Sequence, residues 1–339
     1  MAGIWLNKGN LIGELSEIVG YKAGLCVTYE DMKKYLVGTD YLSLFETNLH
    51  NVVRIRPDEY ESIYFSIIKG VGYIPMEMPN PTPHAWIELS HKYKEDKTKL
   101  DLVTKVYSLY KDWLMNEMKG LPPHSSIDPT NYVKMCKDKY GLSGSENALE
   151  ILQIQANYQE TSPWNKVRRI IWENIVELKD LFKSESLQTY YGSFIDQRYI
   201  DYLSNNFDDI GNINWRKFEG LTCEYFERHG YYVKIGKGRN DGGIDARIWK
   251  SKEDKENPPL VLIQCKRVKS KIEKVVVKAL WADVFYEGAE SGLIVTCSEV
   301  AQGAKNDCTA RGYNIKFSER ETMKKWLEEM RTPYKGFIM

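Results

Sequence analysis

The segment Leu260-Val-Leu-Ile-Gln-Cys265 constrains the fold of this chain more than any other segment. It is a nearly continuous apolar run, with two prolines before it and Lys266-Arg267 after it. A strand that is apolar at successive positions has to be covered on both faces, which is typical of the centre of an α/β sheet. Leu293-Ile-Val-Thr296 is a second run of this type. The C-terminal part of the chain is therefore predicted to contain a sheet covered on both sides.

The elements around these two strands alternate in the order αβββαβαβα. Helices are predicted at 215–228, where Asn214 can act as N-cap, and at 272–287, 299–311 and 319–330. Strands are predicted at 231–235, 244–249, 260–265, 293–296 and 315–317. This order predicts an α/β sandwich around a mixed sheet.

Residues 1–210 give a different pattern, which predicts a mainly α-helical domain. A short strand is expected at 51–56 and an irregular connection at 75–83, which holds four prolines. A helix is expected from about Asp96 to the Gly120-Leu-Pro-Pro segment. Another is expected to begin at Ser162-Pro163, with one apolar face made of Trp164, Val167, Ile171, Ile175, Leu178 and Phe182.

Charge is distributed unevenly between these two parts. The whole chain has 47 Lys+Arg and 47 Asp+Glu, a balance that argues against nucleic-acid binding only if the charges are spread evenly. Residues 1–210 carry 23 basic and 29 acidic residues, a net of −6, whereas residues 211–339 carry 24 and 18, a net of +6. An incidental difference in surface composition could also produce this difference in net charge. We place the domain boundary near residue 210, with domains 1–210 and 211–339.

The sequence also predicts the cellular compartment. No secretory signal and no run of about 18 apolar residues is visible, so no membrane association is expected. The six cysteines are scattered, without the spacing of a zinc site, as is typical of free thiols in a reducing compartment. We therefore expect a cytoplasmic protein.

Three polar residues on the predicted strands, and one on the helix before them, fit a single kind of chemistry. Asp245 begins a strand, and Gln264 and Lys266 lie two residues apart at the end of another; Glu219 lies on the preceding helix. Hydrolysis of a phosphodiester with Mg²⁺ requires oxygen ligands and a cation that stabilises the developing charge. The alternative for Asp245 is an ordinary turn residue after Gly242-Gly243, and for Lys266 a solvated strand end.

A known family shares these residues in this order. Phe218-Glu219, Gly230-Tyr231, Asp241-Gly-Gly-Ile-Asp245, Gln264-Cys-Lys266-Arg267 and Leu293–Thr296 resemble the Mrr-type restriction endonuclease catalytic domain. That domain is a branch of the PD-(D/E)xK nucleases in which glutamine replaces the acidic member of the (D/E)xK pair. The resemblance covers about residues 214–330 and implies an αβββαβ core with a mixed sheet.

The resemblance also implies a role for each residue of the motif. Asp245, Gln264 and the backbone carbonyl of Cys265 would hold Mg²⁺, for which Mn²⁺ can substitute. Lys266 would be the catalytic lysine, and Glu219 would contact a metal-bound water or orient the site. Asp241 matches the first aspartate of the family motif.

Basic residues surround the proposed site and predict contacts with DNA phosphates. They are Lys237, Arg239, Arg267, Lys269, Lys271, Lys274 and Lys278. Lys271, Lys274 and Lys278 are spaced to share one helix face. The alternative is a solvated helix face on which the lysines serve solubility.

Three functions remain open at this point. The first is a metal-dependent DNA endonuclease in restriction or antiviral defence, which would act as a homo-oligomer (a dimer or larger). Its residues 1–210 would serve as a recognition, sensor or oligomerisation module, or would bind an activator or partner protein. The second is a junction-resolving or repair nuclease of the same superfamily. The third is a DNA-binding protein that does not cleave, although Asp245, Gln264 and Lys266 together argue against it.

Overall fold

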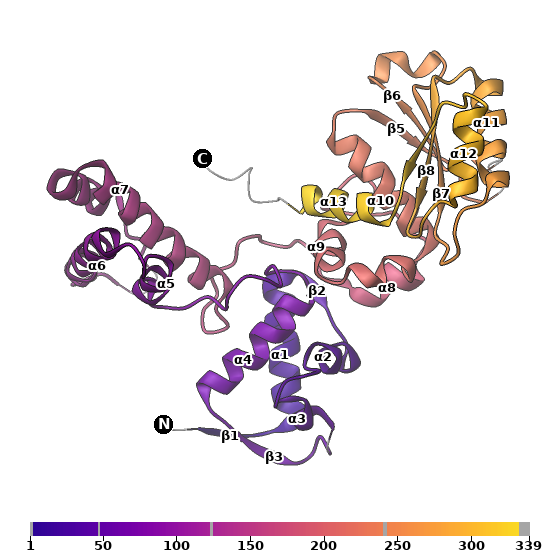
Figure 1. Cartoon of the computed structure of the whole chain (residues 1–339). Coiled ribbons are helices and arrows are strands. Elements are labelled where there is room, and N and C mark those ends of the chain that lie inside the picture. The colour runs from indigo at the N-terminus through magenta and orange to yellow at the C-terminus, as the bar shows by residue number, and fades with distance from the viewer. Residues whose placement is uncertain (1–2, 47, 123–124, 240–242, 332–339) are drawn as a thin grey trace. The chain divides into compact units, whose positions relative to one another are not determined.

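The computed structural model describes residues 3–46, 48–122, 125–239 and 243–331 (Figure 1). The chain divides into two compact units, one made of residues 1–78 and 172–339 and the other of residues 79–171. The division at residue 210 that the charge distribution predicts is a different one and stays a prediction. Within the described residues, no helix is long and apolar enough to cross a membrane.

The unit of residues 79–171 is helical. It contains α5 (Ala85–Lys92), α6 (Lys97–Glu117) and α7 (Thr130–Thr161), and α6 confirms the helix predicted from about Asp96. The three helices share a core in which the ring of Trp113 stacks on Tyr132 at 5.2 Å between centroids. α7 bends at Gly141, where φ is +70°, a backbone conformation that favours glycine.

The prediction of a helix that begins at Ser162-Pro163 is wrong. α7 ends at Thr161, and residues 162–175 form neither helix nor strand. Trp164, Ile171 and Ile175, which were expected to pack as an apolar face, are exposed. Trp172 is buried instead, and its Nε1 donates a hydrogen bond to the Lys22 carbonyl. This contact between distant parts of the chain prevails over the local helical periodicity.

Residues 3–78 and 172–213 form a mainly helical part of the larger unit. β1 (Ile4–Asn7) pairs antiparallel with β3 (Val52–Ile55), which confirms the short strand predicted at 51–56. β2 (Leu25–Cys26) pairs parallel with β4 (Val176–Glu177), so the chain returns after residue 171 to pair with its own N-terminal segment. The helices are α1 (Lys8–Ala23), α2 (Tyr29–Tyr35), α3 (Leu42–Glu46), α4 (Pro57–Gly70), α8 (Leu178–Lys183), α9 (Gln197–Asn205) and the 3-10 turn η1 (Phe207–Gly211).

The rest of the larger unit is a five-stranded mixed sheet with helices on both sides (Figure 1). The strands are β5 (Tyr232–Ile235), β6 (Ala246–Trp249), β7 (Val261–Lys266), β8 (Ser291–Thr296) and β9 (Ile315–Ser318), and they lie in this order across the sheet. β5, β6 and β7 are antiparallel neighbours, whereas β7, β8 and β9 run parallel. The helices are α10 (Trp215–Arg228), α11 (Lys274–Glu287), α12 (Gln302–Ala310) and α13 (Arg320–Met330), and a short 3-10 turn η2 spans Lys252–Glu256. The predicted fold class is confirmed.

β7 is covered on both faces, as its apolar run predicts. Leu262 packs in the core that α11 and α12 cover, and Ile263, on the other face, packs in the core that α10 and α13 cover. Both side chains are fully buried. Because the strand interior is closed on both sides, its polar residues can reach a ligand only at the end of the strand.

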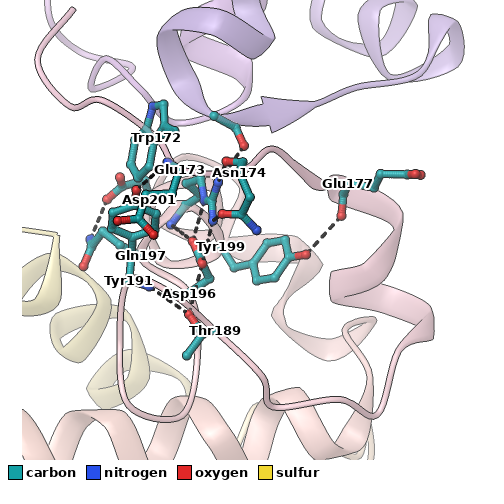
Figure 2. Close-up of polar contacts among 12 residues, drawn as sticks. Trp172, Glu173, Asn174, Glu177, Thr189, Tyr191, Asp196, Gln197, Tyr199 and Asp201 are labelled. Carbon is teal, nitrogen blue, oxygen red and sulfur yellow. Dashed lines mark hydrogen bonds and ion pairs between the residues drawn. The ribbon is translucent and has the colours of Figure 1, made fainter.

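A buried arginine connects three segments of the helical part of the larger unit, and Figure 2 labels three of the residues that it contacts, Trp172, Asn174 and Asp196. Arg198 on α9 is 2% exposed and forms an ion pair with Asp196 at 2.6 Å. Its Nη1 donates hydrogen bonds to the carbonyls of Gly24 and Asn174, and its guanidinium lies 4.8 Å from the ring centroid of Trp172. One cation thus joins the N-terminal segment, the returning segment and α9.

Replacing Arg198 by methionine should destabilise the larger unit by about 3–5 kcal/mol, because Asp196 would remain buried without its counter-charge. The measurement is urea unfolding followed by circular dichroism. Arg311→Met is the matched control, since Arg311 also pairs with an aspartate, Asp307, but on the exposed surface of the sheet domain. Equal stability of the two variants would contradict a fastening role for Arg198.

Candidate active site

Glu219, Asp245 and Gln264 lie together where β6 begins and β7 ends, and Lys266 is the last residue of β7. Ala246 pairs with Ile263, so Asp245 and Gln264 are the next residues on two facing strands. Glu219 approaches from α10, and Lys266 ends β7. Glu219, Asp245 and Gln264 are buried, and Lys266 is half-buried. The structure thus brings Glu219, Asp245 and Gln264 together and places Lys266 two residues after Gln264, at the same end of β7.

The backbone of β7 fixes the carboxylate of Asp245. The amide nitrogen of Cys265 donates a hydrogen bond of 2.6 Å to Asp245 Oδ2. The backbone of Asp245 is held on both sides, because its N–H donates to the carbonyl of Ile263 and its own carbonyl accepts from Gly236. The carboxylate is therefore oriented by the protein itself, beside the Cys265 peptide.

Gln264 presents a buried oxygen at the same place. Its Nε2 donates to the carbonyl of Gly243 at 3.0 Å, while its Oε1 is buried and has no hydrogen-bond partner among the described residues. A buried amide oxygen without a partner is destabilising, so this oxygen is suited to a ligand. Gly243 adopts φ +89°, and a Cβ there would lie 3.3 Å from Gln264 Nε2, so the loop requires glycine.

Glu219 carries a strongly perturbed carboxyl group. Burial and the adjacent negative charge of Asp245 raise its pKa to about 8, although Arg216 opposes part of this shift. Arg216 Nη1 donates to Glu219 Oε2 at 2.6 Å, and Nη2 donates to the carbonyl of Gly236. Arg216 is a site residue that was not predicted from the sequence. Its only sequence signal is its position three residues before Glu219 on the same helix.

These groups fit a hard divalent cation. Asp245 and Glu219 have carboxyl groups that could act as ligands, Gln264 has an amide oxygen without a hydrogen-bond partner among the described residues, and the Cys265 peptide lies beside Asp245. The thiol of Cys265 does not belong to this set, because its Sγ donates to Thr222 Oγ1 and burial raises its pKa well above the usual range. The described parts of the chain hold no group of three or more His, Cys, Asp or Glu residues placed so that they could bind a metal ion by themselves. The candidate ligands are thus mixed oxygen donors.

One comparison with known protein families covers the segment that carries this site. Residues 210–327 match the family model Mrr_cat, described as a restriction endonuclease. This segment is similar to an Mrr-type restriction endonuclease domain, and we call it the Mrr-type domain. No curated protein matches the chain. A solved structure, the MspJI restriction endonuclease in complex with a 27-mer oligonucleotide, aligns at 18% identity with a TM-score of 0.30, over 60% of this chain and 46% of that one. The chain therefore spans less than half the length of MspJI.

The basic residues around the Mrr-type domain's site are arranged less uniformly than the sequence indicates. Lys269 and Lys271 line a cavity of about 870 Å³ at the ends of the parallel strands, together with Lys305 and Arg320. Arg267 is not among the residues that line this cavity, but its Nη1 donates to the carbonyl of Gly211, which does line it. Lys271 does not share a helix face with Lys274 and Lys278, because α11 begins only at Lys274.

Three of these cations pair with carboxylates. Arg239 contacts Glu185 at 2.7 Å, Lys271 contacts Glu299 at 2.8 Å, and Lys278 contacts Asp307 at 3.4 Å. Lys237, Lys269 and Lys274 are exposed, and no ion pair is recorded for them within the described residues. The DNA-contact assignments stay predictions. Asp241 and Gly242 of the family motif lie outside the described residues.

In the metal-free protein, the raised pKa of Glu219 should make stability fall as the pH rises from about 4.5 towards about 8, because the folded state binds a proton that the unfolded state releases. Glu219→Gln removes the titrating group and should flatten this slope. Thermal unfolding in the presence of a chelator, between pH 5 and 9, measures it. Glu328→Gln, on the exposed surface of α13, should keep the original slope. An unchanged slope in Glu219→Gln would contradict the assignment.

Proposed function

We propose that the chain is a divalent-metal-dependent DNA endonuclease that acts in restriction or antiviral defence. The observation that carries this proposal is the buried Oε1 of Gln264, which has no hydrogen-bond partner among the described residues, beside the backbone-anchored carboxylate of Asp245. An Mrr-type restriction endonuclease domain over residues 210–327 supports the same reaction class. Mg²⁺ is the expected cation and Mn²⁺ its substitute.

Asp245, Gln264 and the Cys265 carbonyl would hold the cation, with Glu219 as a fourth oxygen donor or as a group that orients water. A bound divalent cation supplies Lewis-acid polarisation of the phosphoryl oxygen and lowers the pKa of a water molecule. The Gly243 carbonyl fixes the side chain of Gln264, so that its oxygen faces the cation position. Arg216 holds Glu219 in place when Glu219 loses its proton.

Lys266 is the cationic group of the reaction. It lies two residues after Gln264, so both side chains leave the same face of β7 at the end of the strand. The hydroxyl of Thr296 donates to the Lys266 carbonyl at 2.8 Å and fixes the backbone there. Its ammonium would stabilise the negative charge that develops on the phosphate and would help to position the attacking water.

The phosphates of DNA would contact the exposed cations Lys237, Lys269 and Lys274. Phosphates would also replace the carboxylates that now pair with Arg239, Lys271 and Lys278 on the surface. Residues 1–210 are proposed to carry recognition or to bind an activator or partner protein. Their net charge of −6 disfavours direct contact with phosphates.

Asp245→Asn and Lys266→Ala should each reduce the cleavage of plasmid DNA in Mg²⁺ at least about 10²-fold, because each removes a group that acts on the developing charge. Gel analysis of supercoiled, nicked and linear plasmid measures this. Lys316→Ala, an exposed lysine of β9 in the same sheet, is the control and should cleave normally. Cleavage at the original rate by both site variants would overturn the proposal. A loss of cleavage in Lys316→Ala as large as in the site variants would overturn it as well.

Cation binding provides a readout that does not depend on cleavage. Calorimetric titration of the chain with Mn²⁺ should give one site in the Mrr-type domain, and Asp245→Asn should weaken it at least about tenfold because a charged ligand is lost. Lys316→Ala should bind Mn²⁺ as the original chain does. Equal affinity of all three proteins would place the cation elsewhere.

Lys271→Glu combined with Lys274→Glu should weaken DNA binding and reduce the slope of log K against log salt by roughly 2, since about one counterion is released per neutralised phosphate. Fluorescence anisotropy with a duplex at several salt concentrations measures this. Lys324→Glu combined with Lys325→Glu reverses two exposed lysines on α13 and should leave the slope unchanged. Identical slopes for both double variants would reject the proposed DNA face.

A further inference from the structure

α11 exposes an apolar stripe on the side that faces away from the sheet. Its inner face, Val277, Leu280 and Val284, is buried against the sheet. On the opposite face lie Val275, Ala279, Ala282 and Tyr286, spaced by four, three and four residues. Val275 is 71% exposed and Tyr286 is 89% exposed. This spacing is that of a coiled-coil seam, and apolar helix surface of this kind marks an interaction site.

Charges of opposite sign border the stripe. Viewed down the helix, Lys278 lies on one edge and Asp283 on the other. In a parallel helix pair related by a two-fold axis, one edge of each helix lies beside the opposite edge of its partner. Each Lys278 would therefore face Asp283 of the other copy, which lies five residues further along the helix. In an antiparallel pair like edges meet, and lysine would face lysine. The charge pattern is therefore self-complementary for the parallel arrangement.

The surroundings of these two residues favour a partner. Lys278 has only a 3.4 Å contact with Asp307, on a side chain that is 39% exposed. Asp283 lies near Glu287, and burial together with this like charge raises its pKa, although Arg247, which pairs with Glu287, opposes part of the shift. A lysine from a second copy would relieve this repulsion. The two alanines at the centre of the stripe allow the helix backbones to approach closely.

We propose that the α11 stripe pairs with the same stripe of a second copy of this chain, with the two α11 helices parallel. α11 begins eight residues after Lys266 ends β7, so its N-terminal end lies at the same edge of the sheet as the candidate active site. A parallel pair places both active sites at one end of the dimer. Two sites related by a two-fold axis match the two antiparallel strands of a duplex, a consequence that rests on the proposed function.

The association is tested on the full chain without DNA or metal, so its outcome is separate from that of the cleavage experiments. Sedimentation equilibrium at micromolar concentration should give a dimer. Tyr286→Glu should raise the dimer dissociation constant at least about tenfold, because it places a charge in the apolar seam. Leu142→Glu is the matched control, since Leu142 is 70% exposed on α7 of the other unit, and this variant should remain dimeric.

A charge exchange tests the parallel orientation. Lys278→Asp and Asp283→Lys should each weaken the dimer at least about tenfold, because each places like charges opposite one another twice. The double variant should dimerise as the original chain does, and an equimolar mixture of the two single variants should form heterodimers. The defects of the single variants should shrink in 1 M salt.

Three results would overturn the proposal. A monomeric original chain whose α11 is protected from hydrogen exchange would show that another part of the chain covers the stripe. A dimer that is indifferent to Tyr286→Glu would place the interface elsewhere. A dimer that Tyr286→Glu disrupts, but that neither charge variant weakens, would exclude the parallel pairing. Circular dichroism of each variant confirms that it is folded before the association is measured.

Discussion

The burial of β7 on both faces is the constraint on which the rest of the sheet domain depends. Leu262 and Ile263 point in opposite directions into two separate cores, and each core needs its own pair of helices. The chain must therefore cross the sheet repeatedly, and the parallel strands β8 and β9 follow from these crossings. Polar residues are therefore excluded from the interior of the strand and are found at its end, where Gln264 and Lys266 lie.

The candidate site is built by backbone as much as by side chains. Cys265 N–H orients Asp245, and the Gly243 carbonyl orients Gln264. Placing two buried carboxyls beside each other is unfavourable in the absence of a cation, and the pKa of Glu219 is raised to about 8 as a result. The site is thus organised around a positive charge that the chain itself supplies only in part, through Arg216.

The two surfaces that frame the Mrr-type domain have separate roles in our proposals. The cavity edge with Lys269 and Lys271 would hold phosphates, and the outer face of α11 would hold a second copy of the chain. Lys278 links the two interpretations, since the sequence analysis assigned it to DNA whereas its place on the edge of the apolar stripe favours a contact between copies. Lys278 would have to leave its ion pair with Asp307 to contact either a phosphate or a second copy of the chain.

The sequence by itself determined the αβββαβαβα order, because both runs of buried strand residues and the capped helices are local patterns. It also determined the residue types of the site, through the motif from Asp241 to Asp245 and the pair Gln264 and Lys266. Only the tertiary structure left Gln264 Oε1 without a hydrogen-bond partner among the described residues, and replaced the helix expected from Ser162 by a segment that buries Trp172. Each of these depends on contacts between residues far apart in the chain, or on desolvation, and neither leaves a periodic signal in the sequence.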